Sequence, residues 1–141
     1  MKSLVLHSMF AAATLVAVAG SASAQHLTAE IPFAFRAGTA LMQPGTYDVV
    51  ADPGMAATMF RLYNRDTRAS VALVRRATRD ASKVWIANGR PMVAFRCSGG
   101  NCALSEVWTG GAESTVFAAP TSPSGDPVRV VEVRLTSNKA D

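Results

Sequence analysis

The chain has 141 residues, 49% of them hydrophobic and 17% charged, and its 14 basic and 10 acidic side chains give a net charge of +4. This length suits one ordinary domain with a buried core and is too short for two. So small a basic excess aids solubility and weak attraction to anionic surfaces, but it specifies no partner.

The first 24 residues have the parts of a cleavable signal peptide. Lys2 supplies a positive start, an apolar stretch spans 9–19, and Ala22 and Ala24 are the small residues that signal peptidase requires. The apolar stretch falls short of the about 20 residues that a membrane-spanning helix needs. We therefore expect cleavage after Ala24, export to the periplasm or the medium, and one mature domain of residues 25–141 without a transmembrane segment.

The first half of this mature chain alternates apolar and polar residues with the period of β-strands. Ile31, Phe33 and Phe35 fall on one face of an opening strand. Proline and glycine then predict turns, because proline presets φ and glycine tolerates positive φ. The expected turns are 43–45, 52–54 and 64–66, and the strands between and after them are 46–51, 60–64 and 70–75.

The second half continues the pattern, with strands expected over 84–86, 92–97, 102–108 and 128–135. Asn88-Gly89 after the first of these is a hairpin signal. The segment 118–127 holds three prolines and is expected to be a flexible loop. The last strand is rich in β-branched residues, although the spacing of Val128, Val131 and Leu135 also fits a helix.

Seven or eight short strands separated by turns predict an all-β domain, either an antiparallel β-sandwich or a small barrel. The pairing order of the strands does not follow from the pattern.

Cys97 and Cys102 are the two cysteines of the chain and flank a predicted hairpin loop of four residues. A symmetric hairpin places them opposite each other, with Cβ atoms about 4.5–5.5 Å apart, which strand twist brings within disulfide reach. An exported protein favours oxidation of such a pair. Redox enzymes of the thioredoxin type use a shorter spacing, and a zinc site needs about four ligands. We expect a structural disulfide that contributes about 2 kcal/mol.

No arrangement of residues typical of a catalytic site stands out in this sequence. His26 lies two residues from the expected new N-terminus, where chains are usually loose, so it makes a poor general base. Gly99-Gly100 sits at a hairpin tip rather than between a strand and a helix, so it is no phosphate loop. We therefore expect no catalytic residue, no metal site and no cofactor.

Glu106 is an exception to the apolar pattern of its strand. The symmetric hairpin places Phe95 opposite Leu104 and Val93 opposite Glu106, on a face that also holds Trp108 and should point inward. An inward carboxylate needs a partner, and arginine is the natural one. Glu106 is thus either one member of a structural ion pair, a solvated residue at the sheet margin, or a ligand-contacting group.

A basic stretch with neighbouring aromatic residues raises the possibility of an anion-binding patch for nucleic acid or an anionic glycan. Asp66 and Asp80 interrupt it, and strand alternation places its two adjacent arginines on opposite faces, so solvated polar faces and edge protection explain it as well. The candidate patch consists of Arg61, Arg65, Arg68, Arg75, Arg76 and Arg79.

Several landmarks together resemble a group of small exported β proteins of unknown function found in acidobacteria and other soil bacteria. That group has a Phe-x-Phe strand, then Leu-Pro-Ala-Gly-Thr-Tyr-x-Val, an apolar strand ending in Asn, and Phe-x-x-Tyr-Gly-x-x-Tyr-Phe-Leu-x-x-Val-Trp. The matching segments here are 33–35, 42–49 and 62–64, followed by Phe95, Gly99, Leu104, Val107 and Trp108.

The departures from that pattern fall on the hairpin end. Cys97, Ser98, Cys102 and Ala103 stand where the group has Arg, Tyr, Tyr and Phe, so a disulfide here would replace cross-strand aromatic packing. The resemblance covers roughly residues 30–110 and implies fold and location only, since its motifs are turns and core positions.

These observations predict an exported, non-enzymatic β-sandwich that serves as a structural or interaction module of the periplasm or cell surface. Its expected partner is an envelope protein or an anionic glycan, not nucleic acid. A small-ligand carrier of barrel type is the alternative, and it requires an interior cavity.

Overall fold

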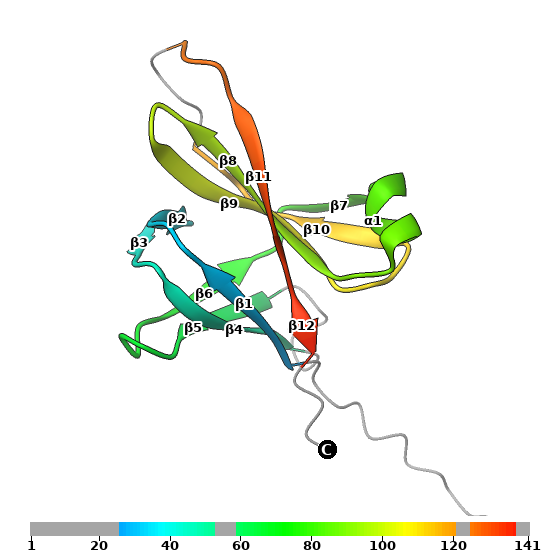
Figure 1. The fold of residues 1–141 in the computed structure, drawn as a ribbon, viewed down its shortest axis with the longest axis horizontal. Coiled ribbons are helices and arrows are strands. Elements are labelled where there is room, and N and C mark those ends of the chain that lie inside the picture. Colours follow the sequence, from blue (N-terminus) through cyan, green and yellow to red (C-terminus); the bar gives the residue numbers. More distant parts are fainter. Residues whose placement is uncertain (1–25, 53–58, 121–124, 138–141) are drawn as a thin grey trace, which may run out of the picture.

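The computed structural model describes residues 26–52, 59–120 and 125–137 (Figure 1). The expected signal peptide, residues 53–54 of one expected turn and residues 121–124 of the expected loop lie outside the described residues. Within the described ranges the chain forms 12 strands and one short helix, and the strands build two sheets rather than a closed barrel. The expected all-β sandwich is confirmed.

The first sheet has five strands, and every pairing in it is antiparallel. Its order is β12 (Thr136–Ser137), β1 (His26–Ile31), β4 (Gly45–Asp52), β5 (Met59–Asn64) and β6 (Ser70–Val74).

The second sheet has seven strands. Its main order is β11 (Arg129–Arg134), β8 (Met92–Ser98), β9 (Asn101–Trp108), β10 (Glu113–Val116) and β7 (Ala77–Asp80). Beside β9, β2 (Phe35–Ala37) joins in parallel and pairs in turn with β3 (Ala40–Met42).

The chain passes from one sheet to the other at both sides of the sandwich. On one side β6 continues into β7, and the backbone N–H of Arg76 between them donates to the carbonyl of Val116 at 2.9 Å. On the other side β11 continues into β12 through Leu135, whose N–H donates to the carbonyl of Pro91 at 2.9 Å. Each of these edge strands is therefore covalently tied to an edge of the facing sheet.

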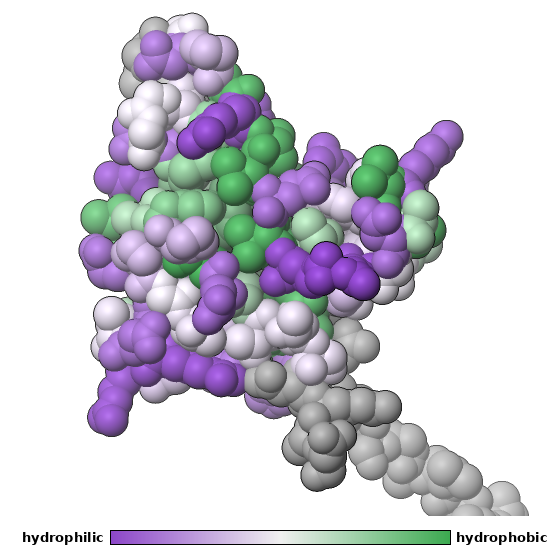
Figure 2. Space-filling view, in the orientation of Figure 1, coloured by the Kyte–Doolittle hydropathy of each residue, from purple (hydrophilic) through white to green (hydrophobic). Residues whose placement is uncertain are grey.

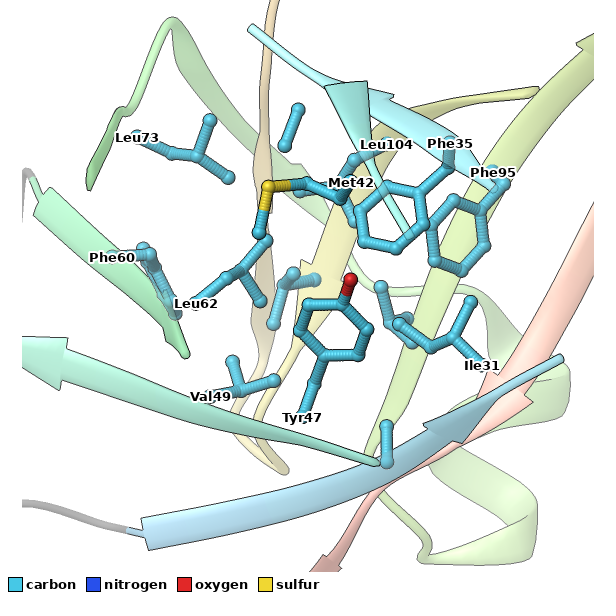
Figure 3. Packing of buried hydrophobic residues seen from close by; sticks show 14 of the residues in the cluster. Ile31, Phe35, Met42, Tyr47, Val49, Phe60, Leu62, Leu73, Phe95 and Leu104 are labelled. Carbon is cyan, nitrogen blue, oxygen red and sulfur yellow. The ribbon is translucent and has the colours of Figure 1, made fainter. Parts of the chain in front are cut away.

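Buried hydrophobic side chains, aromatic rings among them, fill the space between the sheets (Figure 3). The ring of Phe35 meets those of Tyr47 and Phe95 edge to face, with centroids 5.3 and 5.0 Å apart. All three residues are fully buried. Interdigitated rings of this kind bury large apolar areas and hold the sheets in register.

The expected opening strand is interrupted. β1 ends at Ile31 and β2 begins at Phe35, because Pro32 between them has no N–H to donate to a sheet. Ile31 and Phe35 are still buried in the core and Phe33 packs against it, so the inward pattern was predicted correctly although the continuous strand was not.

The strand expected over 84–86 is wrong. This segment belongs to α1 (Lys83–Asn88), which buries Trp85 and leaves Val84 and Ile86 64% and 50% exposed. Gly89 has a left-handed φ of 62° and donates to the carbonyls at the helix end, so Asn88-Gly89 closes a helix instead of a hairpin.

The other strands expected in the second half are present. β8 and β9 match their predictions within a residue, and β11 is a strand, which excludes the helical alternative for 128–135. Residues 118–120 and 125–128 lie in no helix or strand. The sequence pattern missed the short strands β3, β7, β10 and β12.

Candidate binding basin on the second sheet

A bulge in β9 decides where Glu106 points. Phe95 pairs with Leu104 as expected, but Ala94 pairs with Glu106, so Ser105 is an extra residue on β9. An extra residue reverses the inside–outside alternation beyond it. The expected pairing of Val93 with Glu106 is therefore wrong. Glu106 lies beside Ala94 on the outer face, and the hydrophobic Val107 takes the inward place opposite Val93.

Glu106 is nevertheless 3% exposed, because neighbouring strands enclose it. Arg79 of β7 donates its Nε to Oε1 of Glu106 at 2.9 Å and its Nη2 to Oε2. The hydroxyl of Ser114, on β10 between them, also donates to Oε1. The hydrogen bond with Glu106 raises the pKa of the Arg79 guanidinium. The arginine side chain is itself 65% exposed, so the pair is a buried carboxylate capped by a cation that water still reaches.

Helix α1 covers the adjoining part of this outer face. Its Trp85 stacks on Trp108 of β9, with ring centroids 6.3 Å apart and planes at 25°, and packs with Ala81 and Ala94. The indole N–H of Trp108 donates to the carbonyl of Gly111 at 2.7 Å. The indole nitrogen of Trp85 is buried and has no hydrogen-bond partner among the described residues.

A basin of about 890 Å³ opens next to α1 on this face. Ala94, Ser105 and Glu106 line it from the central strands β8 and β9. Trp85 lines it from α1, and Ala119 from the segment after β10. The remaining lining residues are Arg76, Arg79, Asp80, Ser82, Arg96, Val116, Phe117, Val128, Val130 and Glu132. Val128 and Val130 are 47% and 61% exposed, and Figure 2 shows hydrophobic side chains, in green, gathered along the course of β11.

Charges of both signs line the basin in equal number. Its three arginines come from three parts of the chain, Arg96 from β8, Arg79 from β7 and Arg76 from the segment before β7. Asp80, Glu106 and Glu132 balance them. Arg36 on β2 adds a further arginine beside Arg96, since both residues pair with Ala103 of β9, one from each side.

The six arginines of the candidate anion patch do not gather on one face. Arg61 lies on β5 of the first sheet, and Arg65, in the turn after β5, forms a salt bridge with Asp48 of β4 at 2.6 Å. Arg68 occupies a turn with a left-handed φ of 63°, and Arg75 precedes Arg76 where the chain changes sheets. Only Arg76 and Arg79 line the basin, and Arg96, which the sequence pattern did not single out, joins them there.

The expected disulfide is present. Cys97 and Cys102 pair across the β8–β9 hairpin and are bonded, and Cys97 is 1% exposed. In the described ranges, no three His, Cys, Asp or Glu side chains gather closely enough to hold a metal ion. The same ranges contain no helix with the length and hydrophobicity to cross a membrane.

Comparisons with protein-family models, with curated proteins and with solved structures find no match to this chain.

Proposed function

We propose that the mature domain is an exported, non-enzymatic interaction module of the periplasm or cell surface, and that it binds its partner in the basin on the second sheet. The observation that carries this proposal is the buried Glu106 carboxylate beneath Arg79 on the outer face of the second sheet. Burying a carboxylate is unfavourable unless it is paired, so a stable fold alone gives no reason to place one there. A basin of about 890 Å³ falls in the usual size range of ligand sites.

The disulfide supports the exported part of the proposal. Cysteine pairs persist as disulfides mainly in oxidising compartments, and the Cys97–Cys102 bond closes a hairpin without any metal or redox partner nearby in the described part of the chain. It agrees with the signal peptide expected over residues 1–24.

The engagement of Glu106 supports a non-enzymatic role. Its two carboxylate oxygens accept hydrogen bonds from Arg79, and one of them also accepts from Ser114. A general base must lie within hydrogen-bond reach of the substrate proton. Glu106 is instead enclosed beneath Arg79 and holds it as an anchor, which suits a group that orients a binding residue.

A carrier of barrel type needs an interior cavity, and the space between the two sheets is occupied by the buried side chains of the core (Figure 3). We therefore place binding on the outer basin.

The export part of the proposal is tested by cell fractionation with mass spectrometry of the recovered protein. We expect a form that begins at Gln25 in the periplasm or medium. An uncleaved form confined to the cytoplasm would refute export.

The binding part is tested with purified mature domain and washed envelope material of the producing cells. Arg96 is exposed, so Arg96→Glu should preserve the fold while it reverses a charge in the basin. Arg61→Glu makes the same change on the outer side of the first sheet and is the matched control. We expect Arg96→Glu to lose envelope binding and Arg61→Glu to retain it; the opposite pattern would refute the assignment of the basin.

A further inference from the structure

The geometry points to an acidic oligosaccharide of low charge as the ligand of the basin, with its carboxylate held by Arg79 and Arg96 and its hydroxyl groups by the acidic rim. This inference deepens the proposed function and rests on it.

The balance of charges selects the type of ligand. Glu106 is already paired with Arg79. The other charged lining residues are two arginines, Arg76 and Arg96, and two acids, Asp80 and Glu132, so their charges cancel. A polyanion such as nucleic acid or a highly sulfated glycan gains little from a neutral basin, because its attraction to the arginines is offset by repulsion from the acids. A ligand with one carboxylate and many hydroxyls satisfies both signs, since a hydroxyl donates to a carboxylate and accepts from a guanidinium.

The strand pattern favours a sugar over a peptide. The floor of the basin is the face of a sheet whose backbone groups are committed to neighbouring strands, as Ala94 pairs with Glu106 on one side and Glu132 on the other. A peptide lying there would find only side chains for its own N–H and C=O groups, and unpaired amides are costly to bury. Extended peptides usually bind along a free strand edge instead. A sugar carries no backbone amides and needs only side-chain partners.

The layout of the basin also suits an elongated ligand. The lining residues come from five neighbouring strands, β11 to β7, so the backbones at the two ends of the basin lie four strand spacings, or about 19 Å, apart, and the Arg79 guanidinium reaches back from β7 to Glu106 on β9. Val130 and Val116 interrupt the charged groups along this path and offer apolar surface for the C–H faces of sugar rings.

Arg79 is prepared for this role by Glu106. The bidentate contact uses the Nε and one Nη2 hydrogen, so the remaining guanidinium hydrogens are free to meet a ligand in a fixed orientation. A fixed guanidinium loses less side-chain entropy on binding than a mobile one. Glu106 is thereby a positioning residue.

The test is isothermal titration of the mature domain with four probes: 3′-sialyllactose (a trisaccharide with one carboxylate), neutral maltotriose, a heparin hexasaccharide and an acidic tetrapeptide. We expect 3′-sialyllactose to bind at least about tenfold more tightly than each of the others. Arg96→Gln should weaken this binding about tenfold or more, because a charged hydrogen bond is lost, whereas Arg61→Gln on the first sheet should leave it unchanged. Circular dichroism of each variant verifies that the sandwich is intact.

Preferential binding of heparin with steep salt dependence, or of the peptide, would overturn the inference, as would 3′-sialyllactose binding that Arg96→Gln does not affect. If no probe binds while envelope binding still depends on Arg96, the ligand class is wrong and the proposed function stands. If envelope binding is also independent of Arg96, both fail.

Discussion

Removing the cation above Glu106 should destabilise the domain more than removing the carboxylate itself. Arg79→Met leaves a carboxylate that is 3% exposed with Ser114 as its remaining partner. An uncompensated buried charge typically costs 3–5 kcal/mol. Because the Arg79 side chain is 65% exposed, water reaches the vacated position, and we expect a loss of about 3 kcal/mol.

Glu106→Gln keeps the shape of the side chain and returns Arg79 to water, so we expect it to cost only about 1–2 kcal/mol. The double variant Arg79→Met/Glu106→Gln buries no charge, and its free energy of unfolding should fall by about 2 kcal/mol in all. The coupling energy between the two sites is then about 2–3 kcal/mol, well above the value for independent residues.

Urea unfolding measures this cycle, and the fluorescence of Trp85 and Trp108, which stack close to the pair, reports it. Arg61→Met, at an exposed position of the first sheet, controls for the loss of an arginine and should change stability by less than about 0.5 kcal/mol. Additive effects in the double variant, or a larger loss for Glu106→Gln than for Arg79→Met, would refute the reasoning.

Three further predictions concern stability. The double variant Cys97→Ser/Cys102→Ser should fold with a free energy of unfolding about 2 kcal/mol lower than that of the parent. In urea unfolding, reductant should lower the stability of the parent but not that of the variant; a parent whose stability does not change with reductant would contradict this. Asn64 is fully buried, and its Oδ1 accepts hydrogen bonds from two backbone N–H groups at 2.8 and 3.1 Å. Asn64→Ala should therefore lower the free energy of unfolding by about 2–3 kcal/mol, whereas a loss below about 0.5 kcal/mol would show that the turn forms without these bonds. The Arg65 hydrogen bond lowers the pKa of the Asp48 carboxyl below its ordinary 3.8, so the stability from this pair is complete above that pH and lost as the pH falls through the lower folded-state pKa. Asp48→Asn should therefore be less stable than the parent at about pH 6, and this difference should shrink as the pH falls below 3.8; a difference that does not change with pH would contradict the pairing.

Alternation and turn residues sufficed to predict the sandwich because the long strands of its first sheet each have one buried face. β1, β4 and β5 follow the inside–outside pattern that a half-buried sheet imposes. α1 was missed because three apolar residues in a row fit either a strand or one turn of a helix, and only Trp85 packing on Trp108 separates the two. β7 was missed because all four of its residues are exposed, so no pattern marks it.

The sequence singled out Glu106, the central residue of the candidate site, but did not predict the geometry around it. Glu106 stood out as a charge in an apolar strand, and arginine was named as its natural partner, yet nothing in the sequence pointed to Arg79 at 27 positions' distance. The face of Glu106 was assigned wrongly because a bulge at Ser105 depends on pairing with β8 and not on local pattern. Arg96 joins Arg76 and Arg79 only through strand order, which spacing along the chain does not reveal.

The most direct test of binding on the second sheet is an NMR titration of the ¹⁵N-labelled mature domain with a soluble extract of envelope glycans from the producing cells. We expect the indole N–H signal of Trp85 and the backbone signals of Arg96, Val130 and Glu132 to move together, since all four residues line the basin. The signal of Arg61 on the first sheet should stay in place. Shifts confined to the first sheet, or no shifts at saturating extract, would contradict binding in the basin.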